Sequence, residues 1–269
     1  MMARPTRPRM STGLEDEIPR RFRGALAWIV GVVALALAML LSTWVGVADV
    51  GVGDVLDAFA SLVTDAEALD GKIRIVRDLR LPRILGGALV GGTLAVVGVT
   101  LQSVLVNPMA DPYVLGISSG ASVGAAFAFV VGVEAFHGAS VSTLAFVAAT
   151  ATVVAVLRVA RSREGTSPLR LLLAGVAVSS FATALTSFLL HIAPEAMAVR
   201  TLMFWLMGGF AGSDWYGLLW AAIIGLPPAL VLVLSGRAQN VLLLGDETAS
   251  SLGLKIPNPL LIRADRVIE

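Results

Sequence analysis

The sequence predicts an all-α protein, a polytopic bundle of about six transmembrane helices. Its 269 residues are 57% hydrophobic and only 14% charged, whereas soluble domains average roughly 45–50% and 25%. Long runs carry no charge, each near or above the ~20 residues that cross a bilayer as a helix. Only helices fit, because lipid-exposed backbone must satisfy its hydrogen bonds within the segment, and barrel strands would alternate in shorter blocks.

The N-terminal part predicts a cytosolic tail followed by a first span. Residues 1–23 are polar and rich in arginine, and residues 24–47 contain no ionisable side chain. A secretory signal peptide is the competing interpretation, but its apolar core would cover only about 7–15 residues before a cleavage site. The first apolar run is too long for that, so we expect a membrane helix.

Five more uncharged runs predict the remaining spans. They cover residues 84–106, 113–133, 135–157, 171–193 and 215–235. A shorter apolar piece, 201–213, cannot span alone and predicts a half-helix or re-entrant segment. The expected organisation is therefore a tail (1–23), a permease-like membrane domain (24–256) and a polar C-terminal tail (257–269).

Basic residues in the loops predict a multi-pass protein of the cell membrane with its N-terminus in the cytosol. That orientation also places the arginines of the 158–170 loop and Arg237 inside. The loop between the first two spans disagrees, because it puts five cations outside: Lys72, Arg74, Arg77, Arg80 and Arg83. An acidic binding partner is one explanation for such a cluster.

No catalytic, metal or cofactor site is predicted. The chain has no cysteine and two histidines, and it lacks phosphate-loop and zinc-protease motifs. The uncharged runs contain no Asp or Glu that could relay protons, so uphill transport would need energy from a partner subunit. A formal charge of +1 favours no nucleic-acid partner.

Glycines recur at four-residue spacing in two runs, at Gly87 and Gly91 and again at Gly116, Gly120 and Gly124. Such spacing lets neighbouring helices approach closely. Tight bundle packing is the expected role, and a pore-lining face is the alternative.

Three further segments stand out by composition. Residues 80–83 (RLPR) place a proline at a helix start, where its missing N–H is tolerated. Gln102 precedes a proline-punctuated cytosolic turn, residues 107–112 (NPMADP). Residues 242–253 predict a short cytosolic helix, capped by Asp246 at its start and by Gly253 at its end.

Taken in order, these segments give the sequence a resemblance to the permease subunits of ABC importers for iron-siderophore complexes, haem and cobalamin. The segments that carry it lie at 80–83, 91–102, 107–112, 115–116, 120–121, 173–176 (LAGV), 205–208 (WLMG), 244–246, 249 and 252–253. Each pattern is weak alone, and their common order makes the combined match specific.

The resemblance implies a set of partners and roles. It implies a permease homo- or heterodimer, cytosolic ATPase subunits, and an extracytoplasmic substrate-binding protein whose acidic residues dock on Arg80 and Arg83. It also implies a coupling helix that the ATPase moves, made by Gly245, Asp246, Glu247, Ala249, Ser250, Leu252 and Gly253. Near the pathway it places the turn residues Gln102, Asn107, Pro108 and Pro112.

The resemblance also implies a longer protein, since such permeases normally carry about ten spans of roughly 20 residues each. We therefore expect a C-terminally short permease, either truncated or completed by helices from elsewhere. The leading hypothesis is a permease for an iron siderophore, suggested by residues 205–208, with cobalamin or haem as alternative substrates. A non-transporting membrane scaffold that still binds the ATPase is the second hypothesis, and a membrane-embedded enzyme is the third.

Overall fold

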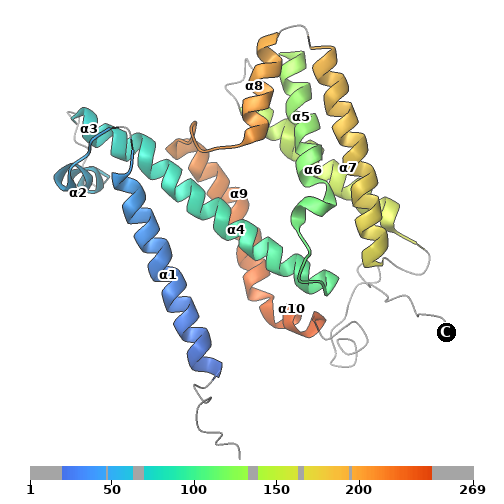
Figure 1. Ribbon diagram of the computed structural model, residues 1–269, viewed down its shortest axis with the longest axis horizontal. Helices are drawn as coiled ribbons and strands as arrows, with labels where there is room; N and C mark the ends of the chain where they lie inside the picture. The colour runs from blue at the N-terminus through green and yellow to red at the C-terminus, as the bar shows by residue number, and fades with distance from the viewer. Residues whose placement is uncertain are drawn as a thin grey trace, which may run out of the picture. The chain divides into compact units, whose positions relative to one another are not determined.

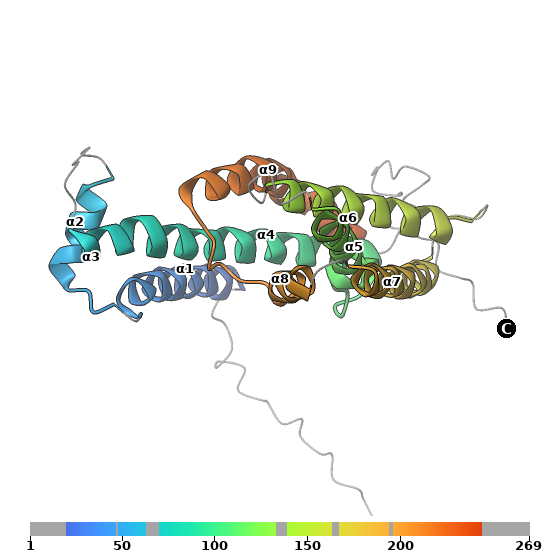
Figure 2. The ribbon, with the colours of Figure 1, turned by 90° about the horizontal axis from the view of Figure 1, so that it is seen from above.

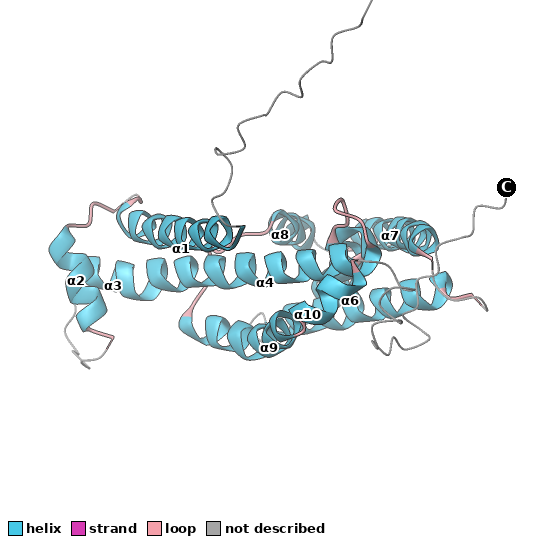
Figure 3. Cartoon of the chain, turned by 90° about the horizontal axis from the view of Figure 1, so that it is seen from below, coloured by secondary structure: helices cyan, strands magenta, loops and turns pink. Residues whose placement is uncertain are grey.

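A computed structural model describes residues 20–46, 48–62, 70–132, 139–162, 167–193 and 196–243. Every element within these ranges is a helix (Figure 3), so the all-α prediction is confirmed. The chain divides into two compact units, residues 1–84 and 85–269, which are described separately below. The expected polar C-terminal tail, 257–269, lies outside the described ranges.

The N-terminal unit contains α1 and a cluster of short helices (Figure 1). Its elements are α1 (Arg20–Trp44), α2 (Val52–Ala60), α3 (Gly71–Arg74), the π-helix η1 (Ile75–Arg80) and the first turn of α4 (Leu81–Leu105). A small apolar core joins the short helices, made by Val50, Val55, Ala58, Val76 and Leu81. Along α1 the large apolar side chains are exposed, which suits a helix surrounded by lipid.

The predicted helix start at Pro82 is wrong, because the helix that contains the second span begins well before that residue. Residues Gly71–Leu105 form one continuous helical run through η1 into α4. In η1 the N–H of Leu81 donates to the carbonyl of Val76, five residues back. A π turn of this kind widens the helix just before Pro82, whose ring lacks an N–H and would crowd an ordinary α-helical turn.

The C-terminal unit is centred on α5, which packs against α6, α7 and α8 (Figures 1 and 2). Besides the rest of α4, its elements are η2 (Pro112–Leu115), α5 (Ile117–Val131), α6 (Ala139–Ala160), α7 (Pro168–His191), α8 (Ala196–Met207), α9 (Trp215–Leu234) and α10 (Gly236–Leu242). Small residues allow the close packing: a Cβ at Gly124 would overlap the Leu144 carbonyl of α6, and one at Gly120 would overlap Thr152. The tight-packing prediction is thus confirmed for this pair. At Gly91 a Cβ would meet nothing within 4 Å in the described part of the chain, so close packing there stays a prediction.

Five helices of the described chain are long and apolar enough to cross a membrane, one fewer than the sequence suggested. The difference lies in the predicted span 113–133, where α5 has only 15 residues. Gly116 precedes α5 and Gly132 follows it, with φ angles of 75° and 77°. Glycine adopts this left-handed conformation readily. The predicted half-helix at 201–213 is present as α8, but it begins earlier and stops at Met207, before Gly208 with φ 71°.

Candidate functional site

A row of hydroxyl groups marks one face of α7. Ser167 caps the helix by accepting a hydrogen bond from the N–H of Arg170, and Pro168 occupies its first turn. Ser179, Thr183 and Ser187 then follow at intervals of four residues. Residues so spaced lie on the same face of a helix, so the three hydroxyls form one polar stripe.

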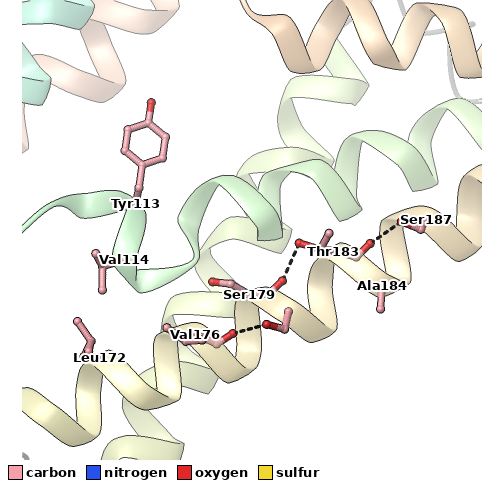
Figure 4. Close-up of a pocket in the computed structure, with 9 residues that line it drawn as sticks. Tyr113, Val114, Leu172, Val176, Ser179, Thr183, Ala184 and Ser187 are labelled. Carbon is pink, nitrogen blue, oxygen red and sulfur yellow. Dashed lines mark hydrogen bonds between the residues drawn. The ribbon is translucent and has the colours of Figure 1, made fainter.

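This stripe lines a pocket of about 670 Å³ within the C-terminal unit (Figure 4). The other wall comes from η2, through Tyr113 and Val114. The full lining is Tyr113, Val114, Leu172, Val176, Ser179, Ser180, Thr183, Ala184 and Ser187. No lining side chain carries a charge, and the described part of the chain holds no cluster of residues suited to bind a metal ion.

Three of the pocket's hydroxyl hydrogens are already used inside the helix. Ser180 donates to the carbonyl of Val176 at 2.9 Å, Thr183 to that of Ser179 at 2.9 Å, and Ser187 to that of Thr183 at 3.1 Å. A hydroxyl that donates its hydrogen still keeps two acceptor lone pairs. These three hydroxyls therefore offer a ligand hydrogen-bond acceptors, which complement amide or hydroxyl donors.

Close backbone contact holds η2 against α7. A Cβ at Gly175 would overlap the carbonyl oxygen of Val114, so only glycine allows this approach. Gly116 ends η2 with a φ of 75°, and a Cβ there would lie 2.7 Å from the Ser179 hydroxyl. Asp111 caps η2 by accepting a hydrogen bond from the Tyr113 N–H at 2.8 Å. These contacts fix the position of Tyr113 at the edge of the pocket.

The predicted turn residues occupy the segment that leads into η2. The N–H of Asn107 donates to the Gln102 carbonyl at 3.1 Å, and the Asn107 side chain accepts from the Met109 N–H at 2.9 Å. Pro112 is the first residue of η2, next to the pocket residue Tyr113. Gln102, Asn107 and Pro108 do not line the pocket, so a role near a pathway stays a prediction for them.

The two arginines predicted to dock a binding protein, Arg80 and Arg83, differ sharply in how far their side chains are exposed. Arg80 is only 9% exposed, and its guanidinium donates to the backbone carbonyls of Thr43, Trp44 and Ala48. Arg83 is exposed, one turn further along the helix. Docking remains a prediction for both residues, but Arg83 alone presents its side chain at the surface.

The predicted coupling-helix residues cannot be compared with the structure. Gly245, Asp246, Glu247, Ala249, Ser250, Leu252 and Gly253 all lie outside the described ranges. Their role stays a prediction.

The sequence did not single out the hydroxyls of α7, although a signal was present. Their four-residue spacing within an uncharged run is visible in the sequence. It did not stand out because other Ser and Thr residues also bond to their own helix, as Thr93, Thr100 and Ser103 do in α4. What distinguishes the α7 stripe is the pocket beside it.

Comparison with protein families gives one match that covers most of the chain. The model of the FecCD transport family matches residues 34–262. This range includes parts of both units, the whole pocket and the two arginines.

Curated relatives share sequence with this chain over most of its length. A cobalamin import system permease protein, BtuC, from Halobacterium salinarum is 40% identical over 182 residues, which cover 68% of this chain and 48% of the relative. Vitamin B12 import system permease proteins BtuC from Citrobacter koseri and Klebsiella pneumoniae are 34% and 35% identical, covering 83% and 87% of this chain. The chain thus spans about half (48%) to two thirds (63% and 66%) of the length of these relatives.

A solved structure has a similar fold. It is a metal-chelate type ABC transporter in an inward-facing conformation, with a TM-score of 0.69 and 28% sequence identity. The similarity covers 83% of this chain and 66% of the solved one. Fold and sequence therefore lead to the same group of proteins.

Proposed function

Because this chain belongs to the FecCD transport family, we propose that it is the membrane permease subunit of a binding-protein-dependent ABC importer. The observation that carries this proposal is the family match over residues 34–262, on a chain with five helices that could cross a membrane. The FecCD family is a transport family, and in our proposal ATP is hydrolysed by a separate subunit. The activity of the complete importer is part of the proposal, since the chain spans 48% and 63% of the first two relatives.

The proposed assembly contains cytosolic ABC ATPase subunits, an extracytoplasmic substrate-binding protein, and a second permease chain of the same or a related sequence. It would lie in the cytoplasmic membrane with its N-terminus in the cytosol, as the arginines of residues 1–23 favour. The uncharged runs support an external energy source, because they hold no acidic residue that could relay protons. Residues 245–253 would couple the permease to the ATPase.

The chemistry of the pocket on α7 is suited to a ligand rich in hydrogen-bond donors. Its hydroxyls offer acceptor lone pairs in a site with no charged lining residue. Cobalamin carries several side-chain amides, whose N–H groups would match these acceptors. An anionic siderophore presents mainly acceptors and would be matched less well.

We therefore favour cobalamin as the ligand over the iron siderophore predicted from the sequence. The names of the relatives support the same choice, since they are cobalamin and vitamin B12 permeases. Weak contacts of this kind are suited to passage, because a ligand on a pathway must be able to leave as well as enter.

Uptake into proteoliposomes tests the proposal. The chain is reconstituted with its ATPase and binding protein, and ATP-dependent accumulation of labelled cobalamin is compared with that of a ferric siderophore. We expect cobalamin uptake that stops when ATP is withheld. Siderophore uptake without cobalamin uptake would overturn the assignment of cobalamin as the substrate. ATPase binding without any uptake would favour the scaffold hypothesis.

A further inference from the structure

The end of α1 has an unusual hydrogen-bond arrangement. The last carbonyls of a helix lack partners within it, and the helix dipole makes that end partly negative. α1 has no basic residue in its own last turn. The cation at this end comes instead from Arg80, more than thirty residues along the chain.

Arg80 spans the α1 end with a planar group that suits several acceptors. It donates to the carbonyls of Thr43 and, at 3.2 Å, of Trp44, the last two residues of α1. It also donates to the carbonyl of Ala48 at 2.6 Å, beyond the helix end. A guanidinium can serve carbonyls on different sides at once, whereas a lysine ammonium acts as a compact point charge.

Gly46 makes the room for this arrangement. A Cβ on Gly46 would lie 2.5 Å from one terminal nitrogen of Arg80 and 2.9 Å from its central carbon. The guanidinium therefore packs directly against the chain that leaves α1. Any larger residue at position 46 must displace it.

We propose that Arg80 is a positioning residue that fixes the end of α1 to η1, and so presents the exposed Arg83 to a partner. The docking consequence rests on the proposed function, because it presumes a binding protein at this surface. In this account Arg80 does not touch the binding protein. It acts through the backbone carbonyls and through the helix that carries Arg83.

The first experiment needs no partner. The chain has no cysteine, so spin labels can be attached at Val45→Cys and Leu79→Cys, two exposed positions beside the contact. We expect a narrow distance distribution in the parent, and a broadened one in Arg80→Gln and Gly46→Ala. Gly53→Ala is the matched control, because a Cβ there meets nothing within 4 Å and the distribution should stay narrow. Unchanged distributions in both Arg80→Gln and Gly46→Ala would overturn the proposal.

The second experiment measures the affinity of the binding protein for the permease in nanodiscs. We expect Gly46→Ala and Arg80→Lys each to weaken docking on the order of tenfold, the equivalent of about one charged hydrogen bond. A direct, charge-based docking role for Arg80 instead predicts little change in affinity, since both variants keep the positive charge. Arg83→Lys should dock nearly as the parent does.

Docking equal to the parent in Gly46→Ala, despite a broadened distance distribution, would overturn the link between this contact and docking. If the parent itself fails to bind any binding protein, the proposed function fails. The spin-label result then still decides whether Arg80 holds the end of α1.

Discussion

The α1 end of the N-terminal unit and the α5–α6 contact of the C-terminal unit are held by opposite means. At the α1 end, a long charged side chain reaches three backbone carbonyls from a distant helix. Between α5 and α6, the absence of a side chain lets the Gly120 backbone approach the Thr152 side chain and the Gly124 backbone approach the backbone of Leu144. The first contact depends on hydrogen-bond geometry and the second on space, so they should respond differently to substitution.

Filling the space between α5 and α6 should have the largest effect. In Gly124→Leu the new side chain would overlap Leu144 and Ala145 of α6, so the helices must separate. We expect the free energy of unfolding to fall by about 3 kcal/mol, as in strongly overpacked cores. Denaturant unfolding in detergent, followed by the fluorescence of the five tryptophans, measures it.

Gly91→Leu is the control for that substitution. It lies in the other run of regularly spaced glycines, but a Cβ there meets nothing within 4 Å. We expect no loss of stability, and a gain of up to about 1 kcal/mol because leucine favours a helix more than glycine does. Equal losses in the two variants would show that close packing at Gly124 does not stabilise the bundle.

Substitution at the contact between η2 and α7 should have the next largest effect on stability. Gly175→Ala would push the Val114 carbonyl away from α7 and move one wall of the pocket. We expect a loss of about 2 kcal/mol in the free energy of unfolding, together with reduced uptake. Gly98→Ala, in an open part of α4, should instead stabilise the helix by up to about 1 kcal/mol. Parent-like stability and uptake in Gly175→Ala would contradict the role given to this contact.

Removing hydroxyls from the pocket should affect transport and leave the fold intact. We expect the double variant Thr183→Val and Ser187→Ala to lower the apparent affinity for cobalamin about tenfold, the loss of one or two weak hydrogen bonds. Uptake at graded cobalamin concentrations measures it. Thr150→Val removes a hydroxyl with the same kind of bond, donated to the Phe146 carbonyl, from an exposed position on α6. An equal loss in that variant would argue against a specific role for the stripe.

A local cap should give the smallest effect. The Asp214 side chain caps α9 by accepting a hydrogen bond from the Gly217 N–H at 2.8 Å. Replacing it in Asp214→Ala should cost about 1 kcal/mol of unfolding free energy. Denaturant unfolding checks this value, and Asp214→Asn should recover most of it. A cost in Asp214→Ala as large as that of Gly124→Leu would reverse the expected order.

The spans could be predicted from sequence because the absence of charge over some twenty residues has one dominant physical cause, burial in lipid. The ends of the helices were harder to predict from the sequence. The π turn before Pro82 and the short α5 depend on backbone conformations that composition does not specify. The resemblance found the right family, which the comparisons confirm.

The sites were harder to predict for a different reason. Arg80 resembles a docking residue in the sequence, and its carbonyl partners lie 32 to 37 residues earlier in the chain, beyond any local pattern. The hydroxyls of α7 form part of a candidate site only because η2 folds against Gly175 and supplies the other wall of the pocket. Long-range contacts, not local preferences, decide both.

The most direct test of the account asks whether the hydroxyl face of α7 borders a water-filled pathway. The chain has no cysteine, so Thr183→Cys and Thr150→Cys each introduce a single thiol. A membrane-impermeant, charged thiol reagent labels only a thiol that can ionise in water. The account predicts rapid labelling of Thr183→Cys in membranes and little labelling of Thr150→Cys. Equally slow labelling of both would contradict a pathway along α7.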